Sequence, residues 1–157
     1  RLNLTLHFCF TIISRIFIMV ATIHLDIVSA EKEFFSGIVE LVVATGLMGE
    51  IGVIFGHAPL LTQLKPGEVR VTLPGGKPEI FYISGGMIEV QPGIVTVLAD
   101  EAERAESLDE AKAIKAKEKA EQALLDRDSN FDYTVAAADL ARAAAQIQAI
   151  RKFRQFK

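Results

Sequence analysis

The sequence is poor in the residues that build disulfides and metal centres. It contains one cysteine, Cys9, and three histidines, at positions 7, 24 and 57. A single cysteine cannot form an intrachain disulfide, and a thiolate metal cluster needs several cysteines. The three histidines do not have the close spacing of a zinc-binding set. The sequence therefore predicts neither a disulfide framework nor a metal centre.

Positive charge is scarce as well. Lysine and arginine number 17 against 20 acidic residues, and the net charge is −3. Proteins that bind nucleic acids concentrate positive charge against the phosphates, so this balance predicts no nucleic-acid partner. Half of the residues are hydrophobic, which is enough for a sizeable core in one compact domain, or in a small domain with an appendage.

Familiar catalytic motifs are missing too. Residues 75–77 (Gly-Gly-Lys) resemble part of a phosphate-binding loop, but the glycine and the serine or threonine that complete the motif are absent. Ser84 lacks the glycine that stands two residues before the serine of a nucleophile elbow. Glu50 and His57 are the residue types of an acid–base pair, yet a structural or interface histidine is the favoured interpretation. The sequence thus predicts a chain that is not itself an enzyme.

The first residues form an unusual leader. Residues 1–18 are an apolar run that His7 and Arg15 interrupt, and Met19 follows them. The run is shorter than the roughly 20 apolar residues of a transmembrane helix. We expect residues 1–18 to be translated upstream sequence without a fold of their own; a signal peptide or membrane anchor is the alternative.

Four glycines punctuate an otherwise apolar segment between residues 46 and 60. They stand at positions 46, 49, 52 and 56, and His57 follows the last of them. A helix does not tolerate so many glycines, since each costs about 1 kcal/mol relative to alanine. In strands, glycines mark bulges, corners or close backbone approach. We therefore expect part of this segment to be packed and part to press against a partner.

Residues 22–100 alternate short strands with turns. Polar and apolar residues alternate over residues 22–28, as in a half-buried strand. Residues 65–67 (Lys-Pro-Gly) predict the end of a strand over residues 60–64, and residues 92–93 (Pro-Gly) fit a type II turn. Many short strands with turns every roughly 8–12 residues are typical of an antiparallel sandwich or barrel.

The last third of the chain changes character, because no glycine or proline follows position 93. Residues 107–110 (Ser-Leu-Asp-Glu) form a capping box that predicts a helix start. Residues 126–130 predict a short loop, and Asp132 is the expected cap of a second helix. That helix has a predicted apolar face made of Ala136, Leu140, Ala143, Ile147 and Ile150. Two helices with a short connection pack as an antiparallel hairpin, and alanines bury little area, so we expect it to be held modestly.

Together these patterns predict an α+β fold: an N-terminal antiparallel β-sandwich over residues 19–104, followed by a C-terminal antiparallel two-helix hairpin over residues 105–157. The end of the hairpin is basic. No acidic residue follows Asp139, whereas the cations there are Arg142, Arg151, Lys152, Arg154 and Lys157. They complement the helix dipole, or they form a surface for an acidic partner protein.

A set of short motifs runs in order through the chain after the leader. They are HLDIVSA (24–30), FSG (35–37), GEIG (49–52), GHAPLL (56–61), SGG (84–86), EVQPG (89–93), VTVLAD (95–100) and LDEA (108–111). Each is weak alone, but in this order they resemble the epsilon-subunit family of F-type ATP synthases. The resemblance implies a β-sandwich followed by a helical hairpin, in agreement with the pattern above.

The resemblance also implies a role. Such a subunit is a non-catalytic part of the rotor of the proton-translocating synthase, where it clamps the gamma subunit to the membrane c-ring. It is peripheral on the cytoplasmic face of the bacterial inner membrane and touches the membrane only through the complex. A loop at the bottom of the sandwich faces the c-ring, and its matching residues here are Gly49, Glu50, Phe55, Gly56 and His57. Phe55 stands where the family has proline, so this loop lacks that source of rigidity.

A regulatory role is implied for the hairpin. In the family it folds against the sandwich or extends along gamma within the alpha and beta subunits, where it blocks ATP hydrolysis. In the extended state, basic residues meet an acidic segment of the beta subunit. The residues in question here are Arg142, Arg151, Lys152 and Arg154. The resemblance therefore favours the acidic-partner interpretation of the basic end.

Some members of the family bind ATP on the hairpin through a Leu/Ile-Asp-x-x-Arg-Ala motif. This chain has Asp109 but carries Lys112 in the arginine position. Lysine cannot supply the planar, bidentate fork of arginine. We expect no resident cofactor and at most weak regulatory ATP binding, and a solvated first helical turn is the favoured interpretation.

The residues leave one different class of function open. A free-standing β-sandwich binding module with a helical oligomerisation hairpin would also explain the apolar glycine-rich segment and the alanine-rich helices. Recovery of the native protein with or without gamma distinguishes the two hypotheses.

Overall fold

The computed structural model describes residues 21–125 and 133–156. The predictions for residues 1–18, for the loop over residues 126–130 and for the Asp132 cap lie outside the described residues. The sandwich strands are β1 (Ile23–Val28), β2 (Glu33–Val39), β3 (Leu41–Gly46), β4 (Gly49–Val53), β5 (Leu60–Thr72), β6 (Pro78–Ile83), β7 (Gly86–Gln91), β8 (Ile94–Ala99) and β9 (Ala102–Arg104). A 3-10 turn, η1 (Ala105–Ser107), leads into the helices α2 (Glu110–Leu125) and α3 (Tyr133–Gln155).

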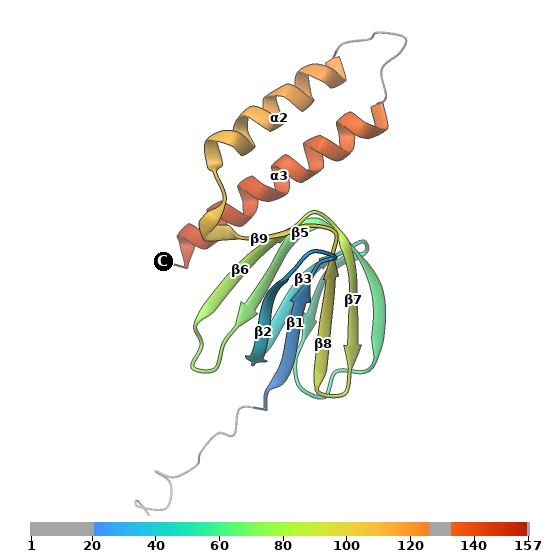
Figure 1. Ribbon diagram of the computed structural model, residues 1–157, viewed down its shortest axis with the longest axis vertical. Helices are drawn as coiled ribbons and strands as arrows, with labels where there is room; N and C mark the ends of the chain where they lie inside the picture. Colours follow the sequence, from blue (N-terminus) through green and yellow to red (C-terminus); the bar gives the residue numbers. More distant parts are fainter. Residues whose placement is uncertain (1–20, 126–132, 157) are drawn as a thin grey trace, which may run out of the picture.

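The strands form two layers that share β5. One layer has the order β2-β1-β8-β7-β5, and the other has the order β4-β3-β5-β6-β9 (Figure 1). Every pairing between described strands is antiparallel except that of β1 with β8, which is parallel. The predicted α+β fold, a largely antiparallel sandwich followed by two helices, is confirmed.

Strand β5 passes from one layer to the other, and here the sequence-based prediction is wrong. The Lys-Pro-Gly turn expected at residues 65–67 is part of a continuous strand of 13 residues. The first half of β5 pairs with β7, and the second half pairs with β3 and β6. Corners of sandwiches are often strands that switch sheets through bends. Gly67 sits at this bend because a Cβ there would lie 2.6 Å from the Cβ of Thr45.

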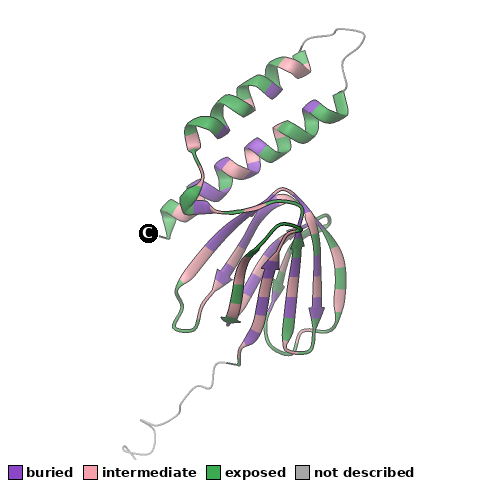
Figure 2. Ribbon diagram, in the orientation of Figure 1, coloured by how far each residue is buried: buried purple, intermediate pink, exposed green. Residues whose placement is uncertain are grey.

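The main core lies between the two layers. Burial alternates along β1, where Ile23, Leu25 and Ile27 point inward and the residues between them remain partly exposed. Buried residues are spread over the strands of the sandwich (Figure 2). Phe81 on β6 is the largest of the fully buried side chains. Burying an aliphatic or aromatic side chain of this kind stabilises the fold by roughly 1.5–3 kcal/mol relative to leaving it exposed. No hairpin residue belongs to this cluster among the described residues, so the sandwich has a core of its own.

The hairpin lies against one outer face of the sandwich. Helix α3 contacts β5 and β6, and it lies between α2 and the sandwich (Figure 1). It therefore has two buried faces. Ala136, Ala143, Ile147 and Ile150 of the predicted apolar face are buried, while Ala145 and Ala149 pack on the sandwich.

Helix α2 begins differently from the predicted capping box. Asp109, not Ser107, is the cap: its Oδ1 accepts hydrogen bonds from the backbone N–H groups of Ala111 at 2.9 Å and Lys112 at 3.2 Å. Ser107 is the last residue of η1. Leu108, which has an extended backbone, packs against the apolar cluster between the hairpin and the sandwich. That tertiary contact displaces the helix start by two residues.

Candidate interaction surfaces

One outer face of the sandwich carries several exposed apolar side chains, and none of the described residues covers it. It belongs to the layer β2-β1-β8-β7-β5, and we call it the apolar sheet face: Ile38, Leu61, Met87, Ile94 and Leu98. Strand register places these side chains on the same face: Met87 pairs with Leu98, His24 stands between Ile38 and Ile94, and Leu61 pairs with Glu89. Contiguous exposed apolar patches in soluble proteins mark interaction sites. The alternation of apolar and polar residues along a strand shows that its two faces differ. It does not show which face the core covers, so the sequence alone could not identify this surface.

A polar cluster interrupts this face. The Ser36 hydroxyl donates to Asp26 Oδ1 at 2.7 Å, and His24 Nε2 lies 3.0 Å from the same oxygen. The three residue types are those of a serine hydrolase triad. In a triad, however, one imidazole nitrogen receives the serine proton while the other is held by the acid. Here the serine donates to the carboxylate, and one nitrogen of His24 faces both partners, so the cluster is not an activated nucleophile.

The five residues that the resemblance assigns to one c-ring loop lie at the two ends of a strand. Gly49 and Glu50 open β4, whereas Phe55, Gly56 and His57 follow its last residue. A five-residue strand is roughly 17 Å long, so these residues form two separate tips rather than one loop, and their contact with the c-ring stays a prediction. Met48, beside the first tip, is 100% exposed, and Phe55 in the second is 56% exposed. His57 Nδ1 lies 2.7 Å from the carbonyl oxygen of Ala58.

The opposite outer face of the sandwich is the one that the hairpin covers. A small apolar cluster joins Ile80 and Tyr82 of β6 to Ala145 and Ala149 of α3. Burial raises the pKa of Tyr82 to about 12, with a further rise from Glu101, while Arg142 and a hydrogen bond with Gln146 act in the opposite direction. The phenol is therefore neutral at physiological pH. The cluster has five buried side chains, three of them alanines with Ala105 included, and Leu108 and Phe153 pack against it.

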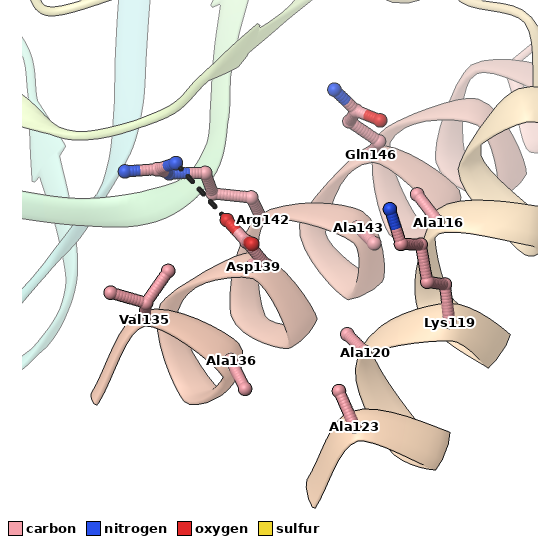
Figure 3. A pocket seen from close by; sticks show the side chains of 10 residues that line it. All are labelled: Ala116, Lys119, Ala120, Ala123, Val135, Ala136, Asp139, Arg142, Ala143 and Gln146. Atoms are coloured by element: carbon pink, nitrogen blue, oxygen red, sulfur yellow. Dashed lines mark hydrogen bonds and ion pairs between the residues drawn. The ribbon is translucent and has the colours of Figure 1, made fainter. Parts of the chain in front are cut away.

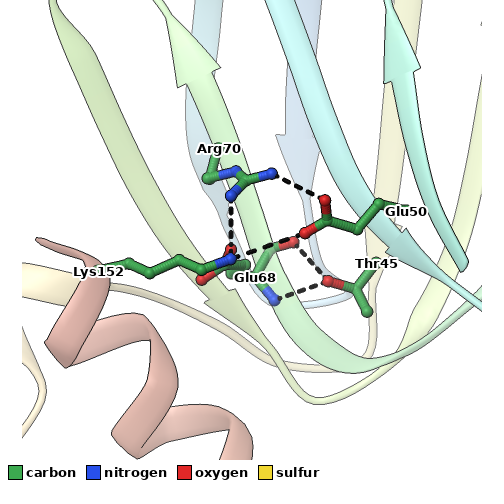
Figure 4. Close-up of polar contacts among 5 residues, drawn as sticks. All are labelled: Thr45, Glu50, Glu68, Arg70 and Lys152. Atoms are coloured by element: carbon green, nitrogen blue, oxygen red, sulfur yellow. Dashed lines mark hydrogen bonds and ion pairs between the residues drawn. The ribbon is translucent and has the colours of Figure 1, made fainter.

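Charged residues border this apolar contact (Figure 4). Glu68 and Arg70 project from β5 toward α3, and Lys152 of α3 binds Glu68. Glu50 completes the group, with its carboxylate 3.1 Å from Arg70 and 3.7 Å from Lys152. We call these four residues the charge cluster. It links the end of the hairpin to the Glu50 tip. The sequence predicts separate surfaces for Glu50 and Lys152, and it gives no signal for Glu68 or Arg70.

Three of the four cations for which the sequence predicts an acidic partner protein have acidic partners within the chain. The pairs are Arg142 with Asp139 (3.4 Å), Lys152 with Glu68, and Arg154 with Glu110 (2.5 Å). Arg151 is exposed, and no ion pair joins it to another residue of the described segments. Of these pairs, only that of Lys152 with Glu68 joins the hairpin to the sandwich, because Arg142 pairs within α3 and Arg154 pairs with a residue of α2.

A hollow of about 570 Å³ separates parts of the two helices (Figure 3). Alanines form much of its lining, which also includes Lys119 and the ion pair of Arg142 with Asp139. Asp109 and Lys112, the residues expected to contact ATP, do not line it. Asp109 instead uses a carboxylate oxygen to cap α2.

Among the described residues, no group of three or more histidine, cysteine, aspartate or glutamate side chains is arranged to hold a metal ion. None of the described helices combines the length and the apolar character needed to cross a membrane.

Comparisons with known proteins agree with the two-part fold. Residues 22–105 match the family described as ATP synthase, Delta/Epsilon chain, beta-sandwich domain. Residues 106–151 match ATP synthase, Delta/Epsilon chain, long alpha-helix domain. Two relatives are ATP synthase epsilon chains. The protein from Legionella pneumophila (strain Lens) is 66% identical and that from Nitrosococcus oceani is 54% identical, each over 137 residues that cover 87% of this chain and 98% of the relative.

Solved structures give the same picture. A chain in the mitochondrial ATP synthase of Euglena gracilis, a structure of OSCP, F1 and c-ring, is similar with a TM-score of 0.68 and 26% identity, over 86% of this chain and 81% of that one. A chain in the central stalk and c-ring of Tetrahymena thermophila ATP synthase has the same fold, with a TM-score of 0.56 and 14% identity over 82% and 96% of the two chains.

Proposed function

This chain belongs to the ATP synthase delta/epsilon family, and from that premise we propose that it is the epsilon subunit of a rotor, holding gamma to the c-ring and restraining ATP hydrolysis through its hairpin. In this role the chain performs no chemistry itself and transmits torque between moving partners. Its proposed location is peripheral, on the cytoplasmic face of the bacterial inner membrane, as expected for a relative of the Legionella protein.

The observation that carries this proposal is that the two outer faces of the sandwich are used differently. The hairpin covers one face, and no part of the chain that the structure describes covers the apolar sheet face. We assign gamma to the open face, because a lasting joint between rotor subunits needs apolar burial that a polar surface does not supply. The polar cluster at His24, Asp26 and Ser36 gives this face directional hydrogen-bonding groups for register.

We assign the c-ring to the Glu50 tip. Met48 beside it is fully exposed, and a flexible thioether adapts well to a partner surface. Gly49 has a φ of +136°, so the tip has a backbone that only glycine adopts readily. Phe55, Gly56 and His57 remain proposed contacts of the stalk at the other end of β4.

The inhibitory part of the proposal is supported by how the hairpin is held. The main core contains no described hairpin residue. The hairpin meets the sandwich through a small apolar cluster, in which three of the five buried side chains are alanines, and through charge pairs. A switch needs two states that differ by only a few kcal/mol, and a small contact of this composition suits that requirement. In the extended state, Lys152 would exchange Glu68 for an acidic residue of the beta subunit, beside alpha, and Arg142, Arg151 and Arg154 would meet the same acidic segment.

A charge on the apolar sheet face tests the rotor assignment. We expect Leu98→Asp to weaken binding of the chain to purified gamma by about tenfold or more, because a buried leucine contributes roughly 1.5–3 kcal/mol and 1.4 kcal/mol is tenfold in affinity. Leu98 is 52% exposed, so the sandwich itself should fold normally. Surface plasmon resonance on immobilised gamma measures the loss.

The matched control is Leu125→Asp, the same change at a leucine that is 80% exposed on the hairpin. It should leave gamma binding unchanged. Equal affinities for both variants would remove gamma from the apolar sheet face. Recovery of the native protein without gamma or any other synthase subunit would favour the free-standing binding module instead.

For nucleotides we propose no resident cofactor and only weak ATP binding. Asp109 is occupied as a helix cap, and Lys112 is exposed. If the motif position matters, Lys112→Arg should tighten ATP binding by about tenfold, since a charge-assisted bidentate contact is worth more than a single one. Isothermal titration with ATP measures this, with Lys115→Arg, an exposed lysine one turn away, as the control. Identical affinities for the two variants would exclude Lys112 as a nucleotide contact.

A further inference from the structure

Glu68 is unusual in this fold because it is charged and covered. It is 6% exposed, and among the described residues no other charged side chain is buried. Val69 and Val71 on either side of Arg70 point into the sandwich core, so Glu68 and Arg70 share the outer face of β5. Helix α3 covers that face. Without α3, the Glu68 carboxylate would stand in water.

The burial of Glu68 is only partly compensated by the sandwich. Arg70 NH1 lies 3.4 Å from Glu68 Oε1, and Lys152 binds the same oxygen. Glu68 Oε2 is buried and has no hydrogen-bond partner among the described residues. Two hydrogen bonds between Thr45 Oγ1 and the Glu68 backbone fix the strand at this point, at 3.2 and 3.3 Å (Figure 4).

Lys152 is the one member of the charge cluster that comes from the hairpin. With it, two acids face two bases. Without it, Glu50 and Glu68 share Arg70 alone. Removing one partner of a buried pair leaves an uncompensated charge, whereas removing both can be nearly neutral. Docking of the hairpin must therefore depend more on Lys152 than on Glu68.

We propose that Lys152 is an electrostatic latch, which holds the hairpin in its docked state by neutralising the carboxylate that docking buries at Glu68. The latch also reaches Glu50, so the docked hairpin and the tip assigned to the c-ring share one set of charges. This inference rests on the proposed function in one respect: an acidic surface of a synthase partner would open the latch by competing for Lys152. The latch within the isolated chain stands independently of that partner.

The test measures docking in the full chain. Spin labels are placed at Lys77→Cys on the sandwich and Gln122→Cys on α2, both exposed, with Cys9→Ser to prevent other labelling. Pulsed electron paramagnetic resonance then gives the distribution of distances. We expect Lys152→Gln to raise the undocked population at least tenfold over the parent chain. Arg151→Gln removes the same charge from the adjacent residue, which forms no ion pair with the described residues, and should change nothing.

The decisive comparison is between the loss of Glu68 and the loss of Lys152. Glu68→Gln should undock the hairpin much less than Lys152→Gln, because the neutral amide loses less hydration on docking. The double variant Glu68→Gln/Lys152→Gln should dock better than Lys152→Gln alone. Equal effects of Lys152→Gln and Arg151→Gln, or a double variant no better than Lys152→Gln, would overturn the latch.

A second measurement separates the latch from the proposed inhibition. Glu68→Lys repels Lys152 and leaves every cation of the hairpin in place. It should undock the hairpin in the isolated chain and lower ATP hydrolysis by the reconstituted catalytic head. Undocking with unchanged hydrolysis would keep the latch and remove inhibition from the proposed function. A hairpin that stays docked in Glu68→Lys would overturn the latch itself.

Discussion

Deleting residues 109–157 is expected to raise ATP hydrolysis by the isolated catalytic head about tenfold to a hundredfold. Coupling between a regulatory element and a distant site is typically worth 1–3 kcal/mol, which corresponds to this range. The cut follows η1 and Leu108, so the last strand and the turn after it remain. A hydrolysis assay on reconstituted head, gamma and truncated chain measures the effect.

The truncated chain should still fold and assemble. The main core contains no hairpin residue among those described, and the apolar sheet face lies on the other layer. The deletion uncovers Ile80 and Tyr82, which lowers solubility more than stability because the core behind them is unchanged. Proton-driven ATP synthesis should therefore persist at close to its full rate. Adding the full-length chain back should restore the low hydrolysis rate. If the truncated complex hydrolyses ATP at the rate of the intact one, only the coupling role remains.

The two-part architecture could be predicted from the sequence because its signals are local. Gly93 illustrates this: the Pro-Gly pair predicts a turn with a positive φ at glycine, and the structure has a φ of +80° there. The lack of glycine and proline after residue 93 likewise separates the helices from the sheet. The cap of α2 and the path of β5 were beyond such signals. In both places a tertiary contact outweighs the local preference. Leu108 packs at the hairpin interface before α2, and Gly67 lies close to Thr45 at the bend of β5.

The surfaces were less predictable than the fold, for the same reason. Residues 68–72 (Glu-Val-Arg-Val-Thr) have the alternation of a strand with one face in water. Burial of Glu68 depends on Lys152, which lies 84 residues further along the chain. β4 pairs with β3 as an extended strand. Residues on its two sides are close in sequence but lie at opposite ends of β4, and this divides the expected c-ring loop into two tips. The pairing of Lys152 with Glu68 and the pairing of β4 with β3 both arise only in the assembled fold, so local sequence patterns do not predict them.

Gly86 is the point at which the sandwich should be most sensitive to a small change. We expect Gly86→Ala to lower the free energy of unfolding by about 3–5 kcal/mol, since it adds backbone strain to overpacking. The residue has a φ of +132°, and a Cβ there would lie 2.1 Å from the Leu98 carbonyl oxygen and 2.9 Å from the Cα of Ala99. These are backbone atoms of the neighbouring strand, so no side-chain rotation can relieve the clash. Urea unfolding followed by circular dichroism gives the difference.

The control is Gly93→Ala, which separates strain from contact. Gly93 also has a positive φ, +80°, but a Cβ there would meet nothing within 4 Å. It should therefore lose only the cost of the left-handed backbone, about 1–2 kcal/mol. Gly86 pairs with Leu64 of β5 as well as with Ala99 of β8, close to the bend where β5 changes layer. A loss in Gly86→Ala no larger than in Gly93→Ala would mean that β7 and β8 can move apart at this point to accommodate the methyl group at little cost, and that close backbone contact is not what requires glycine here.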